Sequence, residues 1–171
     1  MSNNSVLLLK SDTSKEEFDK LFESIKDWGE PGFIWTDDYD ITYNPCVEIG
    51  KYPQTEDGRS GWQGCNLTEA NGAKCNTKEE FFKTCRASAI MGTLQAAYTD
   101  FSYVDKTSPA KEIFDREALL GCSITGFTAN PDILFNEEIL SKGAEILKQV
   151  NKEVSEIIGI NQAARIGCTK P

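Results

Sequence analysis

Strand signals and helix signals alternate along the second half of this chain, and this alternation restricts its fold more than any other feature. A glycine-bounded strand signal at 121–127 precedes an amphipathic helix signal that Asn136 caps and Gly159 closes. A further strand signal follows at 164–169. Strands that alternate with helices of this length form βαβ units around a parallel sheet. We therefore expect an α/β fold in which residues 1–171 form one segment.

The helices have recognisable start and stop signals. Thr13 and Ser14, followed by Glu16 and Glu17, are capping-box signals, and Gly29 with Pro31 is expected to end the helix that follows. Asn76 or Thr77 is expected to cap a longer helix. Core packing is predicted for the apolar stripe of the first helix, which consists of Phe18, Leu21, Phe22, Ile25 and Trp28. The apolar positions of the second include Phe81, Phe82, Cys85, Ala89 and Leu94. The last long helix is predicted to turn inward Ile139, Leu140, Ile146, Leu147, Val150, Val154 and Ile157.

The acidic balance of the chain excludes some classes of partner. A net charge of −9 and a pI near 4.6 argue against a nucleic-acid or anionic-membrane surface, because both need basic patches. No run approaches the roughly 20 apolar residues of a membrane span. The first residues lack the basic region and apolar core of a signal peptide. We therefore expect a cytoplasmic protein that binds neither nucleic acid nor membrane.

The cysteines are the reactive side chains that stand out. Six are present, at positions 46, 65, 75, 85, 122 and 168, and the chain has no histidine and no Cys-x-x-Cys pair. These absences argue against a zinc site, against Cys-His catalysis and against a small thiol-redox protein. Cys75 and Cys85 are expected to be structural because of their helical context. Any chemistry in this chain has to use thiols, carboxylates and amides.

The segment Asn44-Pro45-Cys46-Val47-Glu48 places three such groups at alternate positions. In an extended segment Asn44, Cys46 and Glu48 would line one wall, with Val47 packed behind it. Pro45 favours extension, because the residue before a proline avoids the helical region. The opposing interpretation is that Cys46 is only a small buried apolar residue. The spacing alone leaves both interpretations open.

Several stretches along the chain resemble the catalytic subunits of ribonucleotide reductases. The resemblance begins with 44–48 followed by Cys65-Asn66-Leu67. The supporting stretches, in chain order, are 29–33, 92–101, 121–126 and 168–171. The stretch at 94–101 is most similar to the adenosylcobalamin-dependent (class II) branch, especially its monomeric members that reduce ribonucleoside triphosphates. The alternative within the family is a piece of a class I large subunit, which depends on a separate radical-generating subunit.

The resemblance implies a role for each matching residue. Cys46 would become a thiyl radical that removes the 3′ hydrogen of the ribose, and Glu48 would take the proton of the 3′ hydroxyl. Asn44 would hydrogen-bond the substrate hydroxyls. Cys65 would be one of two reducing thiols that end as a disulfide. Adenosylcobalamin, bound mainly by parts outside this chain, would supply the initiating radical.

The resemblance also implies that the chain is about a quarter of a complete family member. The expected fold is part of a ten-stranded α/β barrel around a finger loop that bears the radical cysteine. The second reducing thiol would lie outside the chain, and no role is implied for Cys75, Cys85, Cys122 or Cys168. The expected partners are other fragments of the same reductase, a ribonucleotide and a thioredoxin-like reductant. A split gene, as in phages, would explain such a piece, and a non-catalytic structural fragment is the alternative.

Overall fold

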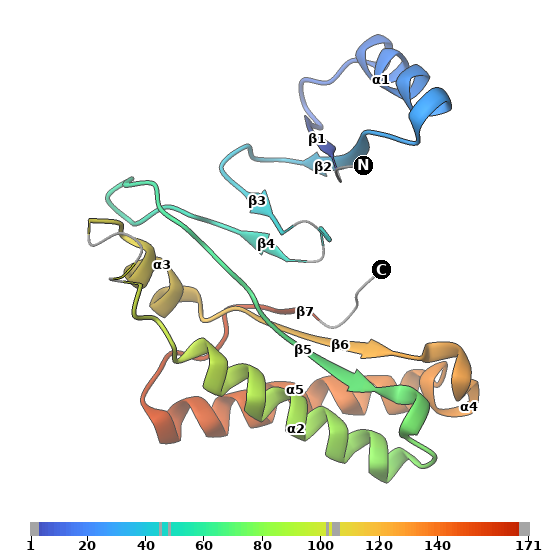
Figure 1. Ribbon diagram of the computed structural model, residues 1–171, viewed down its shortest axis with the longest axis vertical. Helices are drawn as coiled ribbons and strands as arrows, with labels where there is room; N and C mark the ends of the chain where they lie inside the picture. Colours follow the sequence, from blue (N-terminus) through green and yellow to red (C-terminus); the bar gives the residue numbers. More distant parts are fainter. Residues whose placement is uncertain (1–3, 45, 48, 102, 104–106, 168–171) are drawn as a thin grey trace. The chain divides into compact units, whose positions relative to one another are not determined.

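The computed structural model describes residues 4–44, 46–47, 49–101, 103 and 107–167 and divides the chain into two compact units (Figure 1). The first unit is Met1–Tyr52 and the second is Pro53–Pro171. Each unit has its own strands and helices.

The first unit contains a parallel strand pair and a short hairpin. Its elements are β1 (Ser5–Leu9), α1 (Lys15–Trp28), β2 (Gly32–Thr36), β3 (Thr42–Tyr43) and β4 (Gly50–Lys51). β1 pairs in parallel with β2, with Ser5 opposite Gly32 and Leu9 opposite Thr36. β3 and β4 pair antiparallel.

The ends of α1 are as the sequence predicts, but its burial is not. Ser14 and Glu17 form both hydrogen bonds of a capping box, and Gly29 ends the helix in the left-handed conformation at φ 68°. The ring of Phe18 lies 4.9 Å from that of Phe33, measured between centroids. However, no residue of α1 is buried, and Trp28 is 78% exposed. The prediction of a core position for Trp28 is therefore wrong within this unit.

The second unit is built on a parallel sheet in the order β5-β6-β7. Its strands and α-helices are β5 (Asn66–Asn71), α2 (Lys78–Ala96), α3 (Ala110–Glu117), β6 (Leu120–Thr125), α4 (Pro131–Leu134), α5 (Glu137–Ile158) and β7 (Ile166–Gly167). Two single 3₁₀ turns lie at Gly72–Lys74 and Phe127–Ala129. The register places Asn66 beside Leu120 and Leu120 beside Ile166. The predicted βαβ arrangement is confirmed.

The main core of the second unit lies between this sheet and the helices α2 and α5, which pack on each other. Thr77 caps α2 and Asn136 caps α5, as predicted. A side chain at Gly143 would approach the ring of Phe81 to 2.8 Å, so this glycine allows close packing of the two helices. The predicted inward position of Ile157 is wrong, because its side chain is 81% exposed.

The α/β class is confirmed, while the barrel remains a prediction. The described residues form sheets of two, two and three strands, and these do not close into a barrel. Such a composition is consistent with a fragment of an α/β protein. Within the described part of the chain, every helix is too short or too polar to cross a bilayer.

Candidate functional site

The segment that contains Cys46 is the loop of a hairpin and not an extended wall. Thr42 pairs with Lys51, and Tyr43 with Gly50, so residues 44–49 connect β3 to β4. Val47 has a positive φ of 66° and is 38% exposed. The predicted extended geometry, with Val47 packed behind the wall, is therefore wrong. The physical reason is that the loop must reverse the chain, and a backbone in the left-handed region achieves this within few residues.

Asn44 organises this loop through its backbone and its side chain. Its N–H donates to the carbonyl of Ile49 at 3.3 Å, and its own carbonyl accepts from the N–H of Val47 at 2.9 Å. Its side-chain Oδ1 accepts from the buried N–H of Ile49 at 3.0 Å. A backbone N–H can only donate, so the atom facing it must be the amide oxygen. Asn44 is 3% exposed and Ile49 is 2% exposed. The short polar side chain of Asn44 thus accepts from a buried N–H that lies outside the two-residue strands.

The other half of the Asn44 side-chain amide is its Nδ2 group. Its Nδ2 makes no hydrogen bond to any residue that the structure describes. Two residues on, Cys46 lies in the turn and is half-buried. The loop therefore presents an amide donor and a thiol within three residues. Pro45 and Glu48 lie outside the described residues, so the predicted role of Glu48 remains a prediction.

Cys65 lies in the second unit, directly before β5, and is half-buried. Asn66, the next residue, donates both its N–H, at 3.1 Å, and its side-chain Nδ2, at 3.0 Å, to the carbonyl of Leu119. Gly64, the residue before, has no room for a side chain, because a Cβ would lie 2.7 Å from the ring of Phe114. The backbone on both sides of Cys65 is thereby held in place.

A buried carboxylate connects the amino ends of all three strands. Glu117, which is 6% exposed, accepts from Gln63 Nε2 at 3.0 Å and from Arg165 Nη2 at 2.9 Å, and pairs with Arg116 Nη2 at 3.1 Å. Gln63 precedes β5, Glu117 precedes β6 and Arg165 precedes β7. Sequence reasoning missed this group. Its signal is an acidic residue in the last turn of α3, where the helix dipole disfavours negative charge unless cations are near.

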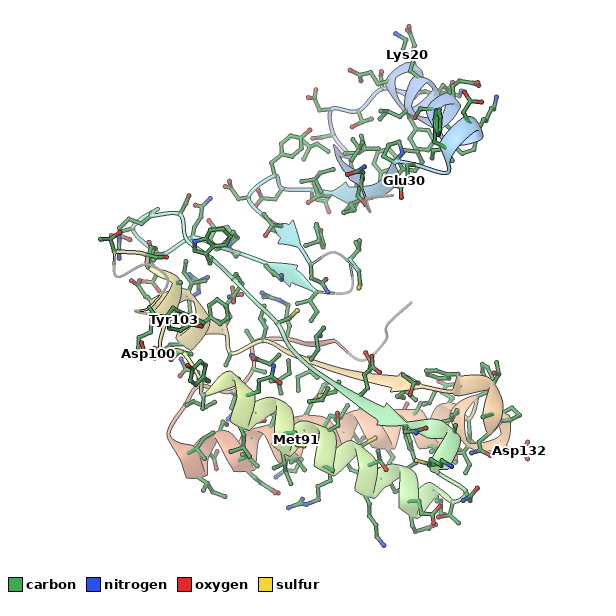
Figure 2. The ribbon with its side chains drawn as sticks, viewed as in Figure 1. Lys20, Glu30, Met91, Asp100, Tyr103 and Asp132 are labelled. Atoms are coloured by element: carbon green, nitrogen blue, oxygen red, sulfur yellow. The ribbon has the colours of Figure 1, made fainter. Side chains whose placement is uncertain are left out.

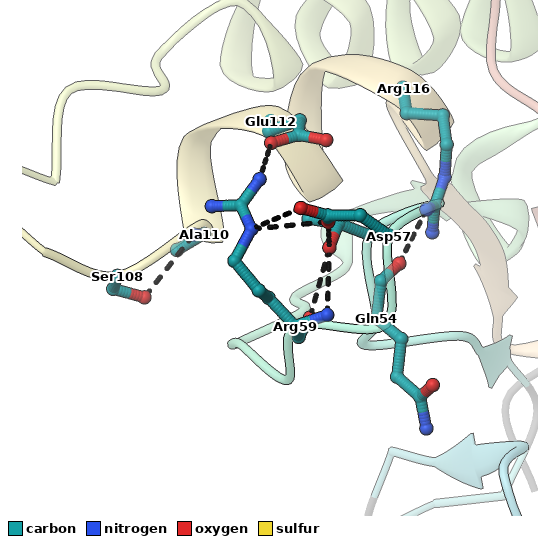
Figure 3. Close-up of polar contacts among 8 residues, drawn as sticks. Gln54, Asp57, Arg59, Ser108, Ala110, Glu112 and Arg116 are labelled. Carbon is teal, nitrogen blue, oxygen red and sulfur yellow. Dashed lines mark hydrogen bonds and ion pairs between the residues drawn. The ribbon is translucent and has the colours of Figure 1, made fainter.

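The loop that leads to Cys65 is fixed to α3, as Figure 3 shows. Arg59 donates Nε to Asp57 at 2.9 Å and Nη2 to Glu112 on α3 at 2.9 Å. From the other direction, Arg116 donates to the backbone carbonyl of Gln54. The Thr55 hydroxyl, and then Arg59, hold the pKa of Asp57 below its ordinary value. These polar contacts hold the segment between Gln54 and Arg59, and they fix the approach to Cys65.

The remaining described cysteines differ from Cys46 and Cys65. Cys75, Cys85 and Cys122 are 2–3% exposed, and this burial is consistent with the structural role predicted for Cys75 and Cys85. Burial, followed by the proximity of the other two thiols, raises the pKa of Cys85 to about 12. A thiol that stays protonated is a poor nucleophile. Cys168 lies outside the described residues. Cys46 belongs to the first unit and Cys65 to the second.

Comparison with known proteins gives one informative match. The chain is 26% identical over 160 residues to the adenosylcobalamin-dependent ribonucleoside-triphosphate reductase of Euglena gracilis. The match covers 87% of this chain and 21% of that protein, so the chain spans about a fifth of the length of this relative. No family model matches the chain, and no solved structure matches it. The match supports a relationship to the ribonucleotide reductases and, more broadly, an oxidoreductase class.

Proposed function

We propose that this chain carries the radical-cysteine segment of an adenosylcobalamin-dependent ribonucleoside-triphosphate reductase. The observation that supports this most directly is the similarity to the Euglena gracilis reductase over most of the chain, together with the ordered motifs around Asn44, Cys46 and Cys65. Because the chain spans only about a fifth of that relative, reductase activity belongs to the chain together with the remainder of such an enzyme.

In this proposal the hairpin loop binds and activates the ribose. Cys46, as a thiyl radical, removes the 3′ hydrogen and later returns it. Asn44 donates Nδ2 to a substrate hydroxyl while its oxygen remains bound to the N–H of Ile49. Glu48 accepts the proton of the 3′ hydroxyl as a general base. The half-buried position of Cys46 suits this role, because a radical needs shielding from water and contact with the substrate.

Cys65 supplies reducing equivalents in the same proposal. Cys65 and a second thiol outside this chain give up two electrons and two protons. The 2′ hydroxyl of the ribose leaves as water, a C–H bond forms in its place, and the two thiols end as a disulfide. A thioredoxin-like reductant restores the pair. The rigid backbone on both sides of Cys65 keeps its sulfur at a fixed position while it cycles between thiol and disulfide.

Adenosylcobalamin would supply the initiating radical from a site formed mainly outside this chain. The cavity between α2, α5 and the sheet has a volume of about 270 Å³, below the range of about 300–1,000 Å³ for ordinary small-ligand pockets. It is lined chiefly by apolar side chains with the buried Cys85 and Cys122, and does not fit a cofactor as large and polar as cobalamin.

The test is nucleotide reduction by the complete enzyme that contains this chain with Cys46→Ala. Product formation should fall to background, because no other side chain can replace the thiyl radical. Cys75→Ala, a buried cysteine outside the loop, is the matched control and should retain activity. Reduction that persists in the Cys46 variant would favour a non-catalytic fragment. A requirement for a radical-generating subunit in place of added adenosylcobalamin would point to class I.

A further inference from the structure

The second unit contains a cavity where α2 and α5 meet the strands β5 and β6. Figure 1 shows the two helices running side by side along one face of these strands. The cavity has a volume of about 270 Å³. Protein interiors are otherwise packed as densely as organic crystals, and voids larger than a water molecule are few. Since an engineered apolar cavity of about 150 Å³ binds benzene, this space is large enough for a small organic molecule.

Small residues from three elements leave this space open. Ala70 comes from β5, Ser88 from α2 and Ala144 from α5. The residue before Ala144 sets the separation of the two helices, because a Cβ at Gly143 would lie 2.8 Å from the ring of Phe81. The helices are therefore already in contact at this point and cannot approach further. A cavity that its surroundings cannot close by collapse is costly to leave empty, so a molecule that fills it is bound favourably.

The walls of the cavity are apolar and partly aromatic. Phe81 of α2 and Phe127, which follows β6, each contribute a ring. The thiols of Cys85 and Cys122 also line the cavity, and burial raises the pKa of Cys85 to about 12, so this thiol is neutral. Among the described residues that line the space, none is charged. A charged ligand would lose its hydration without gaining a counter-charge, so these walls favour a neutral apolar molecule.

The cavity also has a polar group and an aromatic approach at its rim. Ser141 of α5 lines the cavity and is exposed, and its hydroxyl makes no hydrogen bond to any residue that the structure describes. The half-buried ring of Phe127 lies 6.0 Å from that of Phe135, which is 65% exposed. Asp132, labelled in Figure 2, lies on α4 between these two rings in the sequence. Small-molecule sites combine apolar walls with a few such polar groups, which fix the orientation of the ligand.

We propose that this cavity is a binding site for a small neutral aromatic molecule of one or two rings. The rings of Phe81 and Phe127 pack on the ligand, and the hydroxyl of Ser141 hydrogen-bonds a polar substituent at the rim. The volume lies below the range of about 300–1,000 Å³ for ordinary small-ligand pockets, so larger ligands are excluded. The site goes beyond the proposed function and does not depend on it, since neither Cys46 nor Cys65 lines the cavity.

The test titrates indole, a neutral molecule of two fused rings, into the full chain as it is isolated. Calorimetry should show saturable binding at a single site, and the methyl NMR signals of Ala144 and Ile124 should shift, while that of Ala87 should not. Ala144→Phe places a ring inside the cavity and should weaken indole binding at least tenfold. Ala87→Phe adds the same ring at an exposed position of α2 and should leave binding unchanged.

Ala144→Leu is the second variant, in case a phenyl ring is too large for the chain to fold. It fills less of the cavity and should weaken binding to an intermediate degree without lowering the urea midpoint of unfolding. Three results would overturn the proposal: no saturable binding, unchanged affinity in both variants at position 144, and an equal loss of affinity in Ala87→Phe. The radical chemistry is tested separately, because Cys46→Ala should abolish nucleotide reduction and leave indole binding unchanged.

Discussion

The two half-buried cysteines of this chain are supported in different ways. Cys46 lies in a hairpin loop between strands of two residues each, and one buried side chain, Asn44, holds that loop closed. Cys65 lies at the end of a six-residue strand, between backbone segments fixed by Asn66 and by the carboxylate of Glu117 through Gln63. Among the described residues, one side chain, that of Asn44, hydrogen-bonds across the loop, whereas several side chains hold the backbone around Cys65. Under the proposed function, this difference would suit a loop that admits substrate and a thiol that stays in place.

The largest expected effect is on thiol reactivity. Both half-buried cysteines should react with iodoacetamide at pH 8 at least ten times faster than Cys85. The pKa of Cys85 is raised from 9.0 to about 12 by burial, which lowers its thiolate population roughly a thousandfold. Mass spectrometry of peptides over a time course measures the three rates. Equal rates for Cys85 and Cys46 would mean that the loop does not expose its thiol.

The same raised pKa predicts how stability depends on pH. The unfolded thiol of Cys85 ionises near 9.0 and the folded one near 12, so the protonated form is favoured by folding. The associated stability is fully present below pH 9 and is lost as the pH rises from 9 to 12. The free energy of unfolding, measured with urea, should therefore fall over this pH window. It should fall less in the Cys85→Ala variant. An identical pH profile for the variant would contradict the assignment.

At the strand end, removal of the carboxylate should cost the most stability. Glu117→Ala leaves Gln63, Arg116 and Arg165 without their shared acceptor, and we expect a loss of about 2 kcal/mol, reduced from the buried-pair range because Arg165 is half exposed. Urea denaturation followed by circular dichroism measures it. Glu112→Ala, which removes only an exposed partner of Arg59, should stay within about 0.5 kcal/mol. Similar losses in both variants would show that burial of Glu117 contributes nothing.

Local signals in the sequence predicted more of the fold than of the candidate site. The caps at Ser14, Thr77 and Asn136 and the parallel βαβ order depend on neighbouring residues, and they are confirmed. The predicted burial of Trp28 and Ile157 was wrong, because periodicity identifies the apolar face of a helix without showing what covers it.

The prediction of an extended segment at 44–48 failed for another reason. Alternation of residue types predicts a strand only where the backbone can pair, and Asn44 offers Ile49 a side-chain acceptor instead. Glu117 and its partners come from three segments far apart in the sequence, so no local pattern reveals them. The roles of Asn44, Cys46, Glu48 and Cys65 in catalysis remain predictions.

In the hairpin loop, Asn44→Ala should open the turn locally. The substitution leaves the buried N–H of Ile49 without an acceptor, which costs about 1–2 kcal/mol. Hydrogen exchange at the Ile49 amide should accelerate roughly tenfold, while amides of β6 keep their protection. Thr42→Ala, at an exposed position of the same hairpin, is the matched control. Unchanged exchange at Ile49 would show that the loop does not depend on Asn44.

The smallest expected effect is at Asn66, and it tests whether the contacts around Cys65 are independent. Asn66→Ala removes the Nδ2 donor, but the backbone N–H still donates to the carbonyl of Leu119, so the loss should be only about 0.5–1 kcal/mol. Asn66→Asp should cost more, because a carboxylate would face the same carbonyl oxygen. If Glu117 and Asn66 hold Cys65 independently, the effects of Glu117→Ala and Asn66→Ala on the unfolding free energy add in the double variant. A double variant that loses far less stability than the sum would mean that the two residues act as one cooperative unit.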